Sequence, residues 1–309
     1  MIIKFLCAVI TRSLFILVSL IGVWRVTYVK ENNNYWLLTI LYLPLVAEMI
    51  MTLKRRKGSD YKWFSPAILL FLISIIPTIW ILELHHQNTK SDEASCTSLD
   101  SAESFNKALN LTLVQPANET AVDPLQSTLQ FAAQVCSNDW ILALHQILLI
   151  LLIVGKWLMP IGGGFTRDQL SQLLLVFVGT AADILEFTSE TLSDIKNNNF
   201  ALVYIILAVW TWTMLQFPLH LSVMSSDADD LEGQGGGSSF LSKHQADIWQ
   251  IVETLFIQDG PFLLVRLVVM FHFRIVHQML IFFAIKNFLV VVLNIYRLMV
   301  LVQDFKSGL

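Results

Sequence analysis

The feature that most constrains this chain is the recurrence of long apolar runs along its whole length. Runs of about twenty residues occur at 2–24, 35–53, 64–84, 140–159, 170–189, 200–221, 247–273 and 278–302. Each run is long enough to cross a hydrocarbon core about 30 Å thick as an α-helix. The sequence therefore predicts an all-α, polytopic membrane protein with about eight transmembrane helices.

Composition narrows the class of protein further. Only 14% of the 309 residues are charged and 55% are hydrophobic, whereas a typical soluble domain has about 25% charged residues. Eight spans use roughly half of the chain, which leaves little room for a large soluble catalytic domain. The net charge of −4, without a dense basic face, argues against nucleic acid as a partner. The lipid bilayer is the partner that composition predicts.

Charge and modification motifs predict the orientation in the membrane. Cytoplasmic connections near membrane ends accumulate Lys and Arg, and the connection 54–63 carries Lys54, Arg55, Arg56, Lys57 and Lys62. The next connection, 85–139, then lies on the luminal or extracellular side, where it holds N-glycosylation acceptors at Asn110 and Asn118. With eight spans, both termini are expected in the cytoplasm. A glycosylated chain of this kind is expected in the plasma membrane or a secretory-pathway membrane.

The spans group into three segments around two long connections. The segment 1–84 holds the first three helices, 140–221 the next three, and 247–309 the last two with a short tail. The connection 222–246 changes abruptly to an acidic stretch followed by a glycine- and serine-rich stretch. Such a composition is typical of a flexible linker, here acidic and cytoplasmic.

Cysteine usage adds one covalent prediction. Cys96 and Cys136 share the loop 85–139, and an oxidising lumen permits a disulfide between them. A short helix is expected just before Cys136, because Asp123 and Pro124 resemble an N-cap and a first helical residue. Cys7, left without a partner, is interpreted as a small buried apolar residue or, alternatively, as a lipidation site.

Several ionisable residues interrupt the apolar runs, and each one at the membrane centre needs a partner or water. Two interpretations stay open for them: pairing between helices that holds the bundle together, or lining of a polar pathway. The acidic candidates are Glu48, Asp183, Glu186, Glu253 and Asp259; the basic ones are Arg12, Arg266, Lys286 and Arg297, with His145 titratable.

The fifth span carries the most regular pattern of such charges. Asp183, Glu186, Glu190 and Asp194 recur at i, i+3, i+7 and i+11 and so share one helix face. They are expected either to form a cation funnel or to pair with basic side chains of neighbouring helices.

The seventh span contains a possible break in its helix. Pro261 removes an amide donor, which leaves the carbonyl of Ile257 without its helical partner. A break of this kind coordinates ions in many transporters, and a packed proline kink is the alternative. The corresponding hypothesis is an intramembrane cation site formed by Asp183, Glu186, Glu253 and Asp259.

The luminal ends of the third and fourth spans carry a possible metal-binding pattern. Glu83 and His86 lie three residues apart near His85 and His145, a spacing that metal sites use, but histidines at a membrane interface also serve as amphipathic anchors. The sequence contains no His-Glu-x-x-His, no Gly-x-Ser-x-Gly and no phosphate-binding glycine loop followed by Lys and Ser or Thr. No enzyme activity, catalytic residue or cofactor is therefore predicted.

Several ordered strings resemble one known family. They are GVWRVT at 22–27, YKWFSPA at 61–67, LELHH at 82–86, PIGGG at 160–164, RDQLSQ at 167–172, GTAADILEFTSET at 179–191, FIQDGPF at 256–262 and KNFLVVV at 286–292. Together they resemble the transmembrane protein 26 family over nearly all of the membrane-spanning chain. The resemblance implies a multi-pass membrane protein and supplies no reaction, ligand or catalytic residue.

Two functional hypotheses follow. In the first, the protein binds or scaffolds an unknown membrane or luminal partner through its glycosylated loop or its acidic linker. In the second, it moves a cation or a cation-coupled solute through the intramembrane carboxylates. The two hypotheses differ in whether the carboxylates of the fifth and seventh spans meet in one hydrated cavity.

Overall fold

The computed structural model describes residues 2–56, 64–88, 135–159, 167–195, 200–219 and 245–307. All of its named elements are helices, and an isolated bridge between Phe64 and Leu219 is the extended pairing recorded outside them. The prediction of an all-α protein is confirmed. The helices are α1 (Ile2–Lys30), α2 (Leu43–Arg56), α3 (Pro66–Asn88), α6 (Ser137–Leu158), α7 (Arg167–Ile195), α8 (Phe200–Met214), α11 (Gln245–Glu253), α12 (Asp259–Phe271) and α13 (Gln278–Ser307), with the 3₁₀-helix η1 (Asn33–Tyr42) and the π-helix η5 (Thr254–Gln258).

Seven stretches of the described chain are long and apolar enough to cross a membrane. These stretches correspond to seven of the eight predicted spans, and α11, η5 and α12 together form one of them. The predicted sixth span is the exception, because α8 has 15 residues and is therefore about 22 Å long. The chain turns after α8, and the carbonyl of Pro218 accepts a hydrogen bond from the amide of Ser65 at 2.8 Å.

The second span is not a single α-helix. Its first ten residues form η1, and the amide of Leu43 donates to the carbonyl of Ile40 at the junction with α2. In an α-helix that carbonyl would accept from residue 44, but Pro44 has no amide hydrogen. The tighter 3₁₀ pattern supplies a donor one residue earlier, which explains the change of helix type.

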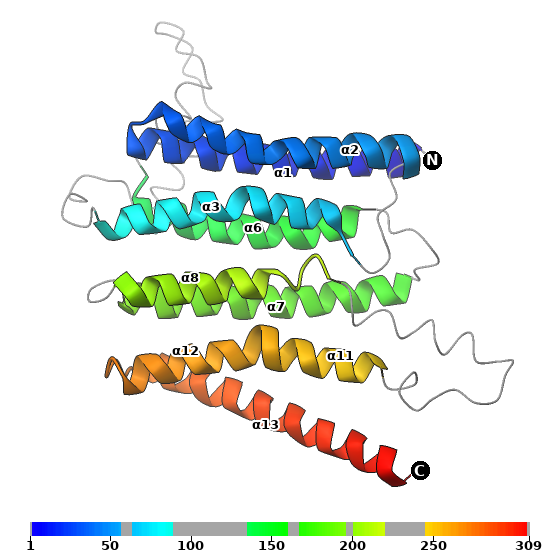
Figure 1. Cartoon of the computed structure of the whole chain (residues 1–309), viewed down its shortest axis with the longest axis vertical. Helices are drawn as coiled ribbons and strands as arrows, with labels where there is room; N and C mark the ends of the chain where they lie inside the picture. Colours follow the sequence, from blue (N-terminus) through cyan, green and yellow to red (C-terminus); the bar gives the residue numbers. More distant parts are fainter. Residues whose placement is uncertain are drawn as a thin grey trace, which may run out of the picture.

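The helices form two rows, and neighbouring helices within each row run antiparallel (Figure 1). One row contains α2, α3, α8 and the α11–α12 span, and the other contains α1, α6, α7 and α13; neighbours contact each other within and between rows. The chain ends lie at the same end of the bundle, where α2 also ends (Figure 1). That arrangement agrees with the prediction that both termini and the 54–63 connection lie on the same side of the membrane. The assignment of that side to the cytoplasm stays a prediction.

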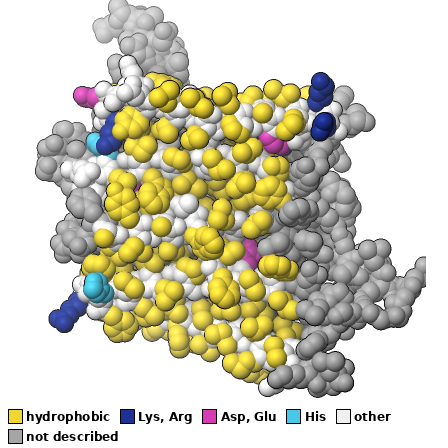
Figure 2. All heavy atoms as spheres, viewed as in Figure 1, with side chains coloured by type: hydrophobic (Ala, Val, Ile, Leu, Met, Phe, Trp, Pro, Cys, Tyr) yellow, Lys and Arg dark blue, Asp and Glu magenta, His cyan; other side chains and the backbone are white. Residues whose placement is uncertain are grey.

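Stacked aromatic rings fill the space between helices. Phe15 of α1 stacks on Phe71 of α3 with ring centroids 4.3 Å apart, and Phe187 of α7 stacks on Phe262 of α12 at 4.1 Å. Apolar side chains also cover the face seen in Figure 2, with Lys, Arg and His side chains toward its edges. An apolar surface of this extent is expected of helices that contact lipid.

Several predicted features lie outside the described residues. They are the glycosylation acceptors, Cys96, the short helix before Cys136, the loop 89–134 and most of the linker 222–246. Cys136 itself precedes the first residue of α6. Glycosylation and the disulfide therefore stay predictions.

Candidate functional site

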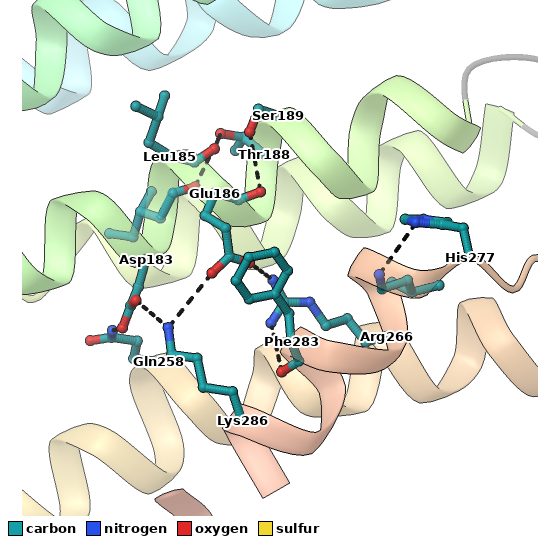
Figure 3. Close-up of polar contacts among 12 residues, drawn as sticks. Asp183, Leu185, Glu186, Thr188, Ser189, Gln258, Arg266, His277, Phe283 and Lys286 are labelled. Atoms are coloured by element: carbon teal, nitrogen blue, oxygen red, sulfur yellow. Dashed lines mark hydrogen bonds and ion pairs between the residues drawn. The ribbon is translucent and has the colours of Figure 1, made fainter.

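Charged side chains from three helices meet where α7 faces α12 and α13 (Figure 3). We call this group the charged cluster and define it as Asp183 and Glu186 of α7, Asp259 and Arg266 of α12, and Lys286 of α13. Within it, Glu186 forms an ion pair with Arg266, and Asp183 forms one with Lys286. Lys286 Nζ also lies 3.6 Å from Glu186 Oε2, so this lysine links both acids of α7.

Two neutral amides complete the charged cluster. Gln258 of η5 donates from Nε2 to Asp183 Oδ2 at 3.1 Å. In the amide orientation that satisfies both of its neighbours, Asn287 donates to Asp259 Oδ1 at 3.2 Å and accepts from Arg266 Nη1 at 2.7 Å. Asp259 therefore contacts its basic neighbour through an amide.

The charged cluster lies inside the membrane-spanning part of the bundle. Asp259 is midway along the span Ile248–Phe271. Asp183 and Lys286 each lie eight residues from the nearer end of their own spans, which is a depth of about 12 Å. The matching depths explain why these two side chains meet, because α7 and α13 run antiparallel through one layer.

The local structure before α12 determines how Gln258 and Asp259 are oriented. Pro261 lies in the first turn of α12, and the preceding residues form the π-helix η5, in which the amide of Asp259 donates to the carbonyl of Thr254. A Cβ atom on Gly260 would lie 1.9 Å from the carbonyl oxygen of Leu255. The wider turn is thus possible only with glycine at this position, and a π-turn occurs where the sequence left open either a helix break or a packed proline kink.

The π-turn η5 is also hydrogen-bonded to α8. The indole nitrogen of Trp212 donates to the carbonyl oxygen of Phe256 at 3.0 Å. Turns that interrupt the regular α-helical pattern need such partners for their carbonyls in a membrane. The sequence indicated an irregularity at Pro261, but nothing in it indicated Trp212 as the partner.

Glu253, the fourth residue of the predicted cation site, lies apart from the charged cluster. It ends α11 and lines a cavity of about 80 Å³ between α7, α11, η5 and the turn after α8. The acids predicted to converge therefore separate into two locations. Three carboxylates meet two basic side chains in the charged cluster, and Glu253 lies in the cavity.

The first two spans contain a second charged pair. Arg12 of α1 donates to Glu48 of α2 from Nε and Nη2, each at 2.8 Å. Thr52 donates to the same carboxylate at 2.6 Å. This pairing agrees with the interpretation that intramembrane charges join helices, and it is separate from the charged cluster.

The remaining candidates do not form a metal centre in the part of the chain that the structure describes. There, no group of three or more His, Cys, Asp or Glu side chains is arranged to hold a metal ion. His145 instead contacts the ring of Trp210 edge-on, with centroids 4.8 Å apart. Glu190 lies further along α7 than the charged cluster, and the side chain of Asp194 is outside the described set.

Sequence reasoning named the charged residues but missed the neutral ones. Gln258, Asn287 and Thr180 connect the charged helices, yet none of them carries a charge that marks it as a candidate in the sequence. The adjacency of Gln258 to Asp259, and of Lys286 to Asn287, is the signal that was present. Adjacency in the sequence does not show which neighbouring helix the amide side chains face.

The comparisons with known proteins agree with this architecture. The sequence profile of the family described as "Transmembrane protein 26" matches residues 2–297, nearly the whole chain. No solved structure matches it. Together, the profile match and the bundle of membrane-spanning helices show that the chain is an integral multi-pass membrane protein that belongs to the transmembrane protein 26 family.

Proposed function

We propose that this protein is not an enzyme and acts by binding or scaffolding partners in the plasma membrane or a secretory-pathway membrane. The observation that carries the proposal is the pairing inside the charged cluster. Lys286 and Arg266 contact Asp183 and Glu186 directly, in the position that a transported cation would otherwise occupy. Paired charges of this kind join helices in membranes, where an unpaired charge is costly.

The charged cluster then serves as a clamp between α7 and the last two helices. Arg266 is nearly fully buried and contacts the rings of Phe187 and Phe283, with its guanidinium carbon 5.6 Å and 5.3 Å from their centroids. Beyond this clamp α13 diverges from the bundle (Figure 1) and exposes apolar residues along its second half. The proposed contact surface for partners is the connection 85–139, with its predicted glycosylation acceptors, or the acidic linker 222–246.

Substitution at Asp183 tests this function. If the charged cluster is a clamp, Asp183→Asn weakens the pairing of Lys286. We then expect the free energy of unfolding to fall by about 1.5–3 kcal/mol, the range for hydrogen bonds to charged groups. The double variant Asp183→Asn with Lys286→Met removes both charges and should recover most of the folding yield. Glu190→Gln, on the same helix but outside the charged cluster, is the matched control.

Folding yield in detergent and cation flux into reconstituted vesicles are measured together for each variant. A clamp predicts reduced yield for Asp183→Asn and no cation-dependent flux with the wild type. The opposite pattern, normal yield with flux that the substitution abolishes, would show that the carboxylates act in transport and would refute the clamp.

Cation-linked transport is the second candidate function. The observation that favours it is the separation of Glu253 from the basic side chains, together with the excess of one carboxylate in the charged cluster. Broken or irregular helices beside polar cavities are where many transporters bind their ions. The vesicle measurement above applies to this candidate without change.

A further inference from the structure

Six of the ten residues that line the cavity beside η5 are polar, although the cavity lies within the membrane-spanning part of the bundle. It has a volume of about 80 Å³, enough for a small ion with one or two water molecules at about 30 Å³ each. Its polar lining comes from three elements and the turn after α8. The residues are Thr180, Gln216, Gln250, Glu253, Thr254 and Gln258.

Glu253 brings a formal negative charge to this cavity without a basic partner among the described residues. Among the residues that the structure describes, neither a lysine nor an arginine lines the cavity, and the ion pairs formed there involve other acids. A carboxylate at this position needs a counter-charge, because an isolated charge inside a membrane is costly. The cavity is large enough to hold a positively charged ion.

Gln216 gives an independent indication of a ligand. Its side chain lines the cavity, the residue is 3% exposed, and its Nε2 atom has no hydrogen-bond partner within the described part of the chain. A buried donor of this kind costs about 1–3 kcal/mol unless something accepts its hydrogen bond. A water molecule in the hydration shell of a bound ion would satisfy it.

The charged cluster orients a further oxygen toward the cavity. Because Nε2 of Gln258 donates to Asp183, its Oε1 atom faces the other way and lies 3.5 Å from Oγ1 of Thr180. Both Gln258 and Thr180 line the cavity. Carboxylate, amide and hydroxyl oxygens are the ligands that hard cations prefer.

We propose that Glu253, with oxygen atoms of Gln258 and Thr180, binds a monovalent cation of the size of Na⁺ in this cavity. One carboxylate balances one positive charge, and water molecules complete the coordination, one of them accepting from Gln216. Protonation of Glu253 alone would require a single hydrogen-bond partner and would leave both the cavity and the Gln216 donor unused. The site is separate from the charged cluster and exists whether or not the protein transports the ion.

The test uses the full chain purified in detergent, with ²²Na⁺ as the probe in choline chloride buffer at pH 7.5. We expect saturable binding by the wild type and at least a tenfold loss of affinity in Glu253→Gln. Glu190→Gln should bind like the wild type. Replacing choline by Na⁺ at constant ionic strength should also raise the Tm of the wild type but not that of Glu253→Gln.

A variant that keeps Glu253 guards against misfolding. Thr180→Val removes one oxygen with little change in volume, and we expect a several-fold weaker ²²Na⁺ affinity. The proposal is overturned if the wild type shows no Na⁺-specific binding relative to choline. It is equally overturned if Glu253→Gln folds and keeps the wild-type affinity for ²²Na⁺. If Glu253→Gln does not fold, the proposal is overturned when Thr180→Val keeps the wild-type affinity.

Discussion

The pair formed by Arg12 and Glu48 offers a quantitative test of how this bundle tolerates buried charge. The side chain of Arg12 is 0% exposed and that of Glu48 is 7% exposed. Two hydrogen bonds of 2.8 Å join them, and the remaining contact of the guanidinium is a 3.3 Å bond to the carbonyl of Ala8. Removing either partner therefore leaves a buried charge almost without compensation.

We expect Arg12→Met and Glu48→Leu each to lower the free energy of unfolding by about 3–5 kcal/mol, the cost of breaking a buried ion pair. Replacing both charges, with Arg12→Met and Glu48→Leu, should cost only about 1 kcal/mol. Thr52 then loses its acceptor on Glu48, but its hydroxyl can bond to the carbonyl four residues earlier, as those of Thr11 and Thr27 do.

The assay is unfolding in mixed micelles, followed by tryptophan fluorescence, on the wild type, Arg12→Met, Glu48→Leu and the double variant. The interaction free energy follows from the double-mutant cycle, and the expected single and double losses correspond to a coupling of about 5 kcal/mol or more. Additive single effects would mean that the two side chains do not stabilise each other. In that case the argument that intramembrane charges join helices here would be wrong.

The other predictions concern the π-turn, the orientation and the covalent chemistry of the chain. Gly260→Ala should destabilise the protein by about 1–3 kcal/mol because a Cβ atom there overlaps a backbone oxygen. The control Gly179→Ala should be neutral or stabilising in the same unfolding assay, because a Cβ atom at that position has no neighbouring atom within 4 Å. Replacing both sequon asparagines by Gln should abolish the glycosidase-sensitive mobility shift of chain inserted into microsomes; unchanged mobility, with glycosylation of a sequon introduced between the second and third spans, would mean the opposite orientation. Mass spectrometry of non-reduced peptides should find Cys96 linked to Cys136 in protein from the secretory pathway, and two free thiols would contradict the predicted disulfide.

The spans were predictable because helix formation in a membrane is a local requirement. Each apolar run has to satisfy its own backbone hydrogen bonds, so its length and composition are enough to identify it, as the agreement over α1, α3, α6 and α13 illustrates. Even the irregular turn before α12 left a trace in the sequence, since Gly260 and Pro261 are adjacent there. Its form as a π-turn, rather than a break, depended on a glycine packed against Leu255 and on Trp212 from another helix.

The partners of the charged side chains were decided by the tertiary structure. The sequence identified Asp183, Glu186, Glu253 and Asp259 as acids within the membrane, and it identified the basic residues that were available to them. Which of these side chains meet depends on the depth and rotation of helices that are far apart along the chain, and an apolar pattern does not fix either quantity. Packing of α7 against α12 and α13 gave two of the acids basic partners, while the turn before α12 left Glu253 in a separate polar cavity.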